Sequence, residues 1–273
     1  MDLDNKLNQI PHVYYVNLDN RIDRRDYMES QFEKWKIKNF TRVSSSKYLA
    51  SEFDLWKHKL HDLDSLLSIK NLHIPTLANS ITHVEMIKTW LETTNDQYMI
   101  MMEDDYDLSL IQYWNFDWTY LMNNIPYDWD CIQLGYESWR HIKFFLHPKD
   151  ETSWWGPVLI NRHYAEKLIK LHYIKDKYLL IRKYGLAEHS TKYRVLGLDD
   201  SICRLGKIYQ LPLITQNPIL DIVPKESHFI CRDAYYDWWQ KQRDNYSLSE
   251  FFSYGKPNDG NMTFNVLDVL KST

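Results

Sequence analysis

The chain has 273 residues, of which 44% are hydrophobic and 26% are charged, so it can bury a core as a disordered segment cannot. Its formal net charge of -4 provides no large positive field, which argues against a dedicated nucleic-acid-binding protein. No apolar run reaches the roughly 18 residues of a membrane span, and residues 1–12 do not resemble a signal peptide. We therefore expect a cytoplasmic protein with no membrane span and no nucleic-acid partner.

Glycine is scarce in this sequence. The chain has 7 glycines, and no two of them form a G-x-G pair. This excludes the dinucleotide fingerprint and the P-loop, because both need clustered glycines to bring backbone amides against phosphate oxygens. A phosphorylated ligand would have to be neutralised in another way, either by a divalent cation held on carboxylates or by arginines.

The first elements in chain order predict a β-α-β unit. Residues 12–18 are a β-branched and aromatic run, typical of a buried strand. Apolar residues recur at helical spacing after Asp23, which is a suitable N-cap. A short strand over residues 40–43 follows, and such units build parallel sheets.

The next segment predicts helices and a strand. Residues 47–76 are charged and leucine-containing, consistent with a helical insertion over the sheet. Thr82 and Glu85 have the spacing of a capping box, which predicts a helix over residues 83–94. Residues 98–102 are an apolar strand that is too short to span a membrane.

The remaining pattern continues to alternate. We expect strands at residues 131–134, 157–160 and 208–213, a helix at 165–171 and a basic insertion at 172–195. The sequence after residue 232 is rich in aromatic residues, and no repeat or low-complexity linker interrupts the chain. The fold class is therefore predicted to be α/β, with one domain over residues 1–232 and a C-terminal extension, 233–273, packed on it.

Three adjacent acids follow the apolar strand at 98–102. Glu103, Asp104 and Asp105 stand where ligands bind in open α/β sheets, at the carboxyl end of a strand. Acids so close repel one another unless a cation compensates, and a hard divalent ion with oxygen ligands is the natural compensator. A solvated acidic strand end gives the same pattern, so the cluster alone leaves both interpretations open.

A second acidic pair and two histidines are further candidates. Asp199 and Asp200 precede a short predicted helix, where they are either N-capping residues or a general base for an acceptor hydroxyl. His83 falls in the first turn of the helix predicted over 83–94, and His228 lies in a polar stretch from which it could reach a metal or a phosphate. A lone histidine is more often structural than functional.

Taken in order, these pieces resemble glycosyltransferase family 25, which contains lipooligosaccharide galactosyltransferases and procollagen galactosyltransferase domains. Residues 13–25, an apolar strand that ends in Asn-Leu before an Asp-Arg-Arg helix start, resemble the N-terminal signature of that family. The further matching blocks are Thr82-His83 with Trp90, Glu103-Asp104-Asp105, Trp129-Asp130, residues 156–168 and Asp199-Asp200.

The resemblance implies a GT-A fold, with a Rossmann-like domain that binds a nucleotide sugar. It also implies a metal-dependent inverting transfer of a hexose, of the galactose or glucose type, from a UDP-sugar to a hydroxyl group. The acceptor would be a glycan or a glycoprotein, and the metal would be Mn²⁺ or Mg²⁺. Because the chain has no glycine loop, the diphosphate would be held by this metal on the acids at residues 103–105.

The resemblance also gives roles to individual residues around that metal. Asp105 is expected to be a direct metal ligand, with Glu103 as a water-mediated or supporting group and His228 as a third ligand. Asp104 would contact the ribose or the metal, and Asn17 is expected near the nucleoside.

Arginines and a base complete the implied site. Arg21, Arg24 and Arg25 would lie near the end of the first strand, one of them beside the diphosphate. Asp200 is the expected general base, with Asp199 as a close second choice.

Two other functions are compatible with the same residues. A non-catalytic relative with this fold would bind a carbohydrate or a protein without turnover. A nucleotidyltransferase also holds a divalent cation and a nucleotide on acids at strand ends, and it would release pyrophosphate rather than a nucleoside diphosphate.

Overall fold

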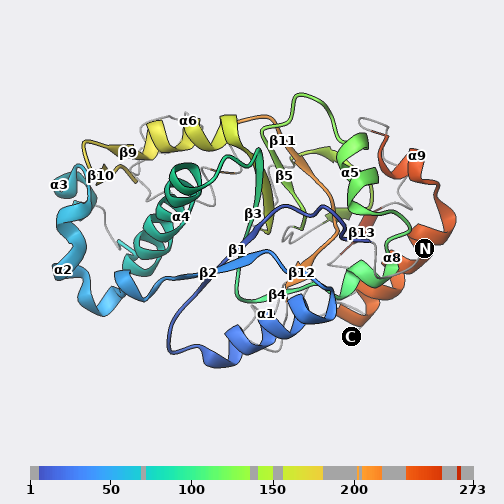
Figure 1. Cartoon of the computed structure of the whole chain (residues 1–273), viewed down its shortest axis with the longest axis horizontal. Helices are drawn as coiled ribbons and strands as arrows, with labels where there is room; N and C mark the ends of the chain where they lie inside the picture. Colours follow the sequence, from blue (N-terminus) through green and yellow to red (C-terminus); the bar gives the residue numbers. More distant parts are fainter. Residues whose placement is uncertain are drawn as a thin grey trace.

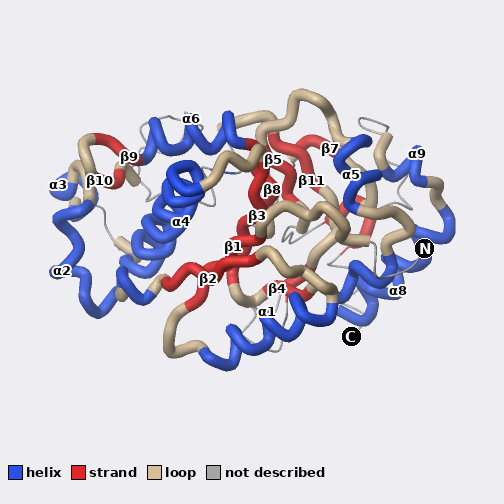
Figure 2. Tube along the Cα trace, viewed as in Figure 1, coloured by secondary structure: helices blue, strands red, loops and turns tan. Residues whose placement is uncertain are grey.

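The computed structural model describes residues 6–68, 72–135, 141–149, 156–180, 202, 205–216, 232–253 and 263–265. In these residues a seven-stranded sheet is enclosed by helices, which gives an α/β architecture as the sequence predicts (Figure 1). The sheet crosses the middle of the molecule, with α4 (Ile74–Thr93) and α6 (Arg162–His172) on one side and α1 (Ile22–Lys34) on the other (Figure 2).

The sheet is mixed, and its strand order is β2-β1-β3-β8-β5-β11-β7. Strand β1 pairs in parallel with both β2 and β3, and β5 pairs in parallel with β11, whereas β8 and β7 are antiparallel to their neighbours. The predicted β-α-β unit at the start of the chain is therefore confirmed. The strands are β1 (Val13–Asn17), β2 (Phe40–Ser44), β3 (Tyr98–Glu103), β5 (Cys131–Gln133), β7 (His147–Pro148), β8 (Val158–Asn161) and β11 (Ile208–Gln210).

The sheet is buried on both faces, which is why its strands are continuous apolar runs. In β1, Tyr15 belongs to the core on the side of α1, and Tyr14 belongs to the core on the side of α4. Strand β3 alternates in the same way, with Met102 on the α1 side and Met101 on the α4 side. At their carboxyl ends the two strands carry polar side chains, Asn17 in β1 and Glu103 in β3.

Two helix starts differ from the sequence prediction. Helix α1 begins at Ile22 with Arg21 as its N-cap, so Asp23 lies in the first turn instead of capping the helix. Helix α4 begins at Ile74, nine residues before the predicted start, with a proline in its first turn, where proline is well tolerated. The capping-box interpretation of Thr82 was wrong, because its hydroxyl donates to the Ala78 carbonyl 3.0 Å away inside the helix.

The insertion is helical, as predicted, and it packs beside α4. It consists of η2 (Ser46–Tyr48), η3 (Ala50–Glu52), α2 (Phe53–Trp56), η4 (Lys57–Lys59) and α3 (Leu63–Leu67). A hairpin of β9 (Tyr173–Ile174) and β10 (Lys177–Tyr178) lies against it, and the His61 amide donates to the Tyr178 carbonyl at 2.8 Å. The predicted insertion was three residues too long, since residues 74–76 belong to α4.

Residues 232–253 of the C-terminal segment are largely helical and join the core on the α1 side. Trp239 of α8 (Arg232–Asn245) and Phe251 of α9 (Leu248–Phe251) are buried in the same cluster as Ile132 of the sheet. The Trp239 indole donates to the Pro212 carbonyl at 2.8 Å. The remaining elements are η5 (Ser109–Tyr113), α5 (Trp118–Asn124), and the strand pairs β4 (Tyr106–Asp107) with β12 (Thr215–Gln216) and β6 (His141–Lys143) with β13 (Thr263–Asn265).

Candidate functional site

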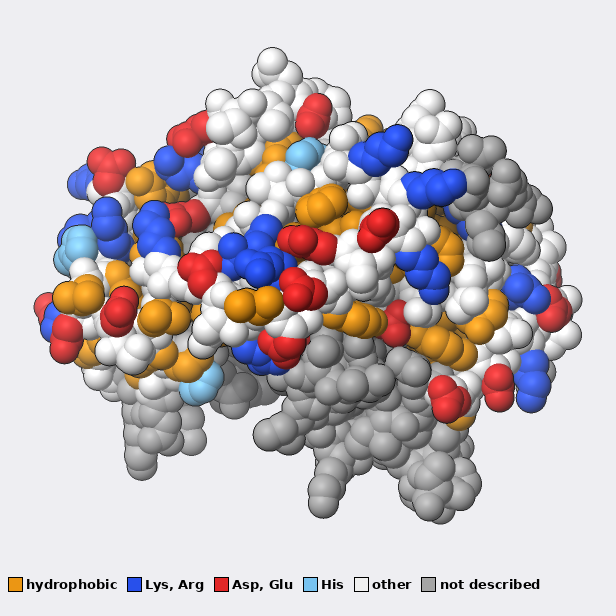
Figure 3. Space-filling model, turned by 60° about the horizontal axis from the view of Figure 1, so that its bottom comes forward, with side chains coloured by type: hydrophobic (Ala, Val, Ile, Leu, Met, Phe, Trp, Pro, Cys, Tyr) orange, Lys and Arg blue, Asp and Glu red, His pale blue; other side chains and the backbone are white. Residues whose placement is uncertain are grey.

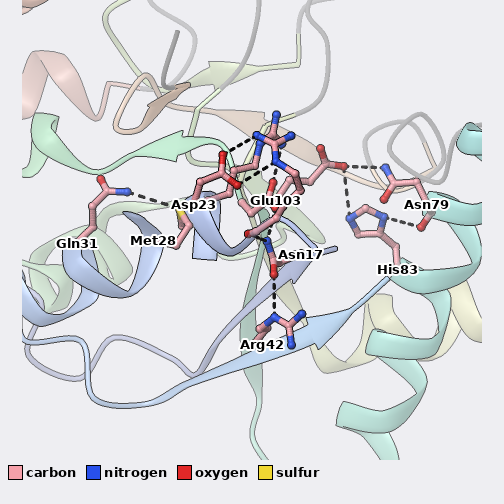
Figure 4. Close-up of polar contacts among 11 residues, drawn as sticks. Asn17, Asp23, Met28, Gln31, Arg42, Asn79, His83 and Glu103 are labelled. Atoms are coloured by element: carbon pink, nitrogen blue, oxygen red, sulfur yellow. Dashed lines mark hydrogen bonds and ion pairs between the residues drawn. The ribbon is translucent and has the colours of Figure 1, made fainter. Parts of the chain in front are cut away.

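Polar side chains meet where β1 and β3 end. The two strands are parallel, and Val16 is opposite Glu103, so Asn17 at the end of β1 lies next to the acids that follow β3. Carboxyl ends of neighbouring parallel strands share one edge of the sheet, where ligands bind in open α/β folds. The close-up shows the side chains from β1, α1, β3 and α4 converging at this edge (Figure 4).

Asp104 is the centre of this group. Its Oδ1 accepts a hydrogen bond from Arg24 Nη1 at 2.7 Å, and its Oδ2 accepts one from Asn17 Nδ2 at 2.6 Å. Asp104 is only 6% exposed, and the Arg24 side chain is 12% exposed. A buried carboxylate needs such partners, because an unpaired charge away from water is costly.

Asn17 is held on several sides. Its Nδ2 also donates to the Arg21 carbonyl at 3.0 Å, and its Oδ1 accepts from Arg42 Nε on β2 at 2.8 Å. Arg42 in turn forms an ion pair with Asp19. With its acceptor and donor groups both engaged, the 1% exposed Asn17 amide has one orientation, which joins β1, β2 and the start of α1.

Arg21 lies at the mouth of this network. Its Nε and Nη2 donate to the two oxygens of Asp23 at 3.1 and 2.9 Å. The hydrogen bond to Asp23 raises the pKa of Arg21, with a further contribution from the charges of Asp104 and Asp105. The same pair lowers the pKa of Asp23 to about 2, so both groups carry their charge at neutral pH.

Glu103 connects the site to α4. Asn79 Nδ2 donates to Glu103 Oε1 at 2.8 Å, and His83 Nε2 is 3.9 Å from the same oxygen. His83 Nδ1 contacts the Asn79 carbonyl at 3.0 Å, one turn earlier (Figure 4). His83 is buried in the middle of α4, so the prediction that it lies in a first turn was wrong.

A pocket of about 440 Å³ opens beside these groups, within the range of roughly 300 to 1,000 Å³ that is usual for small-molecule sites. On the face turned forward in Figure 3, Lys and Arg side chains gather beside Asp and Glu side chains, with hydrophobic side chains next to them. The lining residues are Val16, Asn17, Leu18, Arg21, Arg24, Ser45, Tyr48, Leu49, Ala50, Ser51, Pro75, Ala78, Asn79, Glu103 and Asp104.

The sequence and the resemblance gave a site role to ten residues, and the structure brings five of them together in the pocket lining, namely Asn17, Arg21, Arg24, Glu103 and Asp104. Two others lie apart from the pocket lining. Arg25 has its Nε 3.7 Å from Asp26 Oδ1, and Asp105 is buried. The remaining three, Asp199, Asp200 and His228, lie outside the described residues.

Three residues of the site were not predicted. Arg42 orients Asn17, Asn79 binds Glu103, and Tyr48 forms part of the pocket wall. Asn79 was hidden by the late start predicted for α4, because it is one turn before His83 and on the same helical face. Arg42 and Tyr48 carry no sequence signal, since their roles depend on where β2 and the insertion pack.

The acids at the strand end do not by themselves make a metal site. Both oxygens of Asp104 already accept hydrogen bonds from Arg24 and Asn17, which leaves this carboxylate badly placed as a metal ligand. Among the residues that the structure describes, no three His, Cys, Asp or Glu side chains gather as metal ligands do.

No protein-family model matches this chain, and a search of curated proteins finds no significant match. In the described part of the chain, no helix has the length and apolar character needed to cross a bilayer. The interpretation of the site therefore depends on its geometry and on the sequence resemblance.

Proposed function

We propose that this protein is a glycosyltransferase that moves a hexose, of the galactose or glucose type, from a UDP-sugar to a hydroxyl group of a glycan or glycoprotein acceptor. The observation that carries the proposal is the pocket at the carboxyl ends of β1 and β3, where Arg21 and Arg24 lie beside Asn17. That position in an α/β sheet is where nucleotides bind, and the resemblance to a family of UDP-sugar enzymes points to the same ligand. GT-A remains the proposed form of the fold.

The pocket lining combines apolar and polar groups, which suit different parts of a nucleotide. Leu49, Ala50, Pro75 and Ala78 are apolar and are suited to a nucleobase. Arg21 and Arg24 supply the positive charge of the lining. Small-molecule sites combine an apolar wall with a few converging polar groups in this way.

The two arginines of the lining are suited to a diphosphate. Guanidinium groups recognise phosphate oxygens with paired hydrogen bonds, and Arg24 lies in the first turn of α1, where the helix dipole favours an anion. In a transfer reaction, negative charge builds up on the departing nucleoside diphosphate, and fixed cations stabilise it. Asp104 and Asp23 hold the two arginines in place before the ligand arrives.

The metal ion and the general base of this transfer are proposed from the family resemblance. Mn²⁺ or Mg²⁺ would supply further charge stabilisation for the leaving group, with Glu103 and Asp105 as the acids that the resemblance implies would hold it. The proposed general base, Asp200 with Asp199 as second choice, and the proposed third ligand His228 lie outside the described residues. The role that we propose for the described residues is therefore to bind the donor and to stabilise the charge of its diphosphate.

A nucleotide-release assay tests the proposal. Purified protein is given UDP-glucose, UDP-galactose, UDP-N-acetylglucosamine or GDP-mannose with Mn²⁺, and the released nucleotide is identified by chromatography. We expect UDP from one of the UDP-sugars, with loss of the activity in Arg24→Lys and retention in Lys34→Met, an exposed position on the same helix. An arm with EDTA shows whether a metal is needed.

Other outcomes would favour the alternatives. Release of pyrophosphate would identify a nucleotidyltransferase. A thermal shift with a UDP-sugar but no turnover would favour a non-catalytic binding module, because a ligand that binds only the folded state stabilises it. If no donor released a nucleotide and no donor gave a thermal shift, the proposal would be overturned.

A further inference from the structure

A second polar cluster lies on α4, outside the pocket. Its centre is Glu85, whose Oε1 accepts hydrogen bonds from the Tyr178 hydroxyl at 2.6 Å and from Lys47 Nζ at 2.9 Å. The Tyr48 hydroxyl donates to the same oxygen. Three donors from two separate parts of the chain, the insertion and the β9–β10 hairpin, therefore meet on one carboxylate oxygen.

Tyr48 connects this cluster to the pocket. It lines the pocket and is almost fully buried, and its hydroxyl is bound by Glu85. Its ring also packs edge-on against Trp56, with centroids 5.8 Å apart, and against Tyr178, with centroids 6.4 Å apart. The position of this part of the pocket wall is thus determined by contacts on the side away from the ligand.

Helix α4 serves both clusters. Ala78 and Asn79, in its first half, line the pocket directly, and Glu85 lies about two turns further along. Because η2 and η3 supply Tyr48, Ala50 and Ser51 to the opposite wall, the width of the pocket depends on how firmly these segments are held against α4. Glu85 provides a charged anchor for that contact.

We propose that Glu85 is a positioning residue for the nucleotide pocket: it fixes the wall at residues 46–52 against α4 through Tyr48 and Lys47. This inference rests on the proposed function for the identity of the ligand. Glu85 does not line the pocket, so its effect on a ligand is transmitted through the wall. Loss of the anchor loosens the wall, and the free protein must then order it again when the nucleotide binds, which lowers affinity.

The test compares two substitutions with a matched control. UDP binding is measured by calorimetry for wild type, Glu85→Ala, Glu85→Gln and Glu92→Ala, which removes an exposed glutamate of the same helix that pairs with Lys88. We expect Glu85→Ala to bind UDP with a Kd about tenfold higher than that of wild type. The loss of one charged hydrogen bond is large enough to cause a change of this size. Glu85→Gln keeps an acceptor oxygen for the tyrosine hydroxyls and should recover most of the affinity.

The kinetic parameters KM and kcat distinguish this role from a general loss of stability. For the donor sugar identified by the release assay, Glu85→Ala should raise KM for the donor and leave kcat at saturating donor unchanged, because the ordered wall is recovered once the ligand is bound. Equal KM values in Glu85→Ala and Glu92→Ala would overturn the proposal, as would a drop in kcat alone.

Hydrogen exchange separates failure of this inference from failure of the proposed function. In the ligand-free protein, amides of residues 46–52 should exchange faster in Glu85→Ala than in Glu92→Ala, whether or not UDP is the ligand. If wild type binds no nucleotide but exchange at residues 46–52 rises, the proposed function fails and the anchoring role stands. If exchange there is the same in both variants, the anchoring role is refuted.

Discussion

Asp104 and Glu85 are both carboxylates enclosed by donors from several elements, but their surroundings differ. Asp104 is buried at a strand end, and each of its oxygens accepts one hydrogen bond, from the charged Arg24 and from Asn17. The Glu85 side chain is 27% exposed, and one of its oxygens receives two tyrosine hydroxyls and a lysine. One cluster borders a pocket, whereas the other joins surface elements.

The difference shows that the role of a buried carboxylate depends on which side chains donate hydrogen bonds to it. A guanidinium has five N–H donors, whereas a tyrosine hydroxyl has one hydrogen, which in the Glu85 cluster is used inside the protein. The Asp104 cluster places a charged arginine in the pocket lining, and the Glu85 cluster stabilises the pocket wall.

The largest expected effect is that of Asp104→Ala. It leaves the buried Arg24 charge without its 2.7 Å partner and removes one of the two acceptors of Asn17 Nδ2, so we expect a loss of about 3 to 5 kcal/mol in the free energy of unfolding. Denaturant unfolding measures this, and a double-mutant cycle with Arg24→Ala should give a loss well below the sum of the two single losses. A loss of less than about 1 kcal/mol, typical of a surface pair, would refute the comparison.

Arg42→Gln is expected to have a smaller effect on the same cluster. It removes the Nε donor from the Asn17 Oδ1, which is buried, and the cost of a buried polar atom without its partner is about 1 to 3 kcal/mol. The matched control is Asp19→Asn, which alters the exposed end of the Arg42 interaction and the hydrogen bonds of Asp19 with Ser44 and Ser46, and it should cost less than about 1 kcal/mol. Equal losses in the two variants would show that Arg42 does not act through Asn17.

Much of the Asp104 cluster could be predicted from the sequence, because strand ends carry a local signal. An apolar run followed by acids at 103–105 and a second run ending at Asn17 indicate two buried strands, and parallel pairing brings their ends together. The pairing partners within the cluster were not predictable. Asp104 was expected near a ribose or a metal, which stays a prediction, and its contacts with Arg24 and Asn17 were not foreseen.

The Glu85 cluster could not be predicted, because its partners are far apart in the sequence. Lys47, Glu85 and Tyr178 come from three elements whose contact depends on tertiary packing. The local pattern was also misleading: Thr82 and Glu85 have capping-box spacing, but the apolar stripe extends back to Leu77 and the true start is marked by Pro75. Two residues in the middle of a helix thus had the spacing that is typical of a helix start.

Glu85→Gln should lower the free energy of unfolding by about 1 kcal/mol, less than either substitution in the Asp104 cluster. The amide keeps an acceptor for Tyr48 and Tyr178 and loses the charge that attracts Lys47, which is itself largely exposed. Denaturant unfolding at neutral pH measures the loss, with Glu92→Gln on the same helix as the control. If the loss exceeded that of Asp104→Ala, the ranking of the two clusters would be reversed.

The smallest effect is a pH dependence that belongs to the Glu85 cluster. Burial raises the pKa of Glu85, but hydrogen bonds from Tyr178, Tyr48 and Lys47 outweigh burial, and its pKa is below the ordinary value of 4.5. The unfolded chain therefore takes up a proton at a higher pH than the folded chain does, and the stabilisation by the ionised carboxylate is lost as the pH falls through the folded-state pKa. The difference in unfolding free energy between wild type and Glu85→Gln should be constant between about pH 8 and pH 6 and should shrink below about pH 4.5. A difference that grew on acidification would mean that the tyrosine hydroxyls do not favour the ionised form of Glu85.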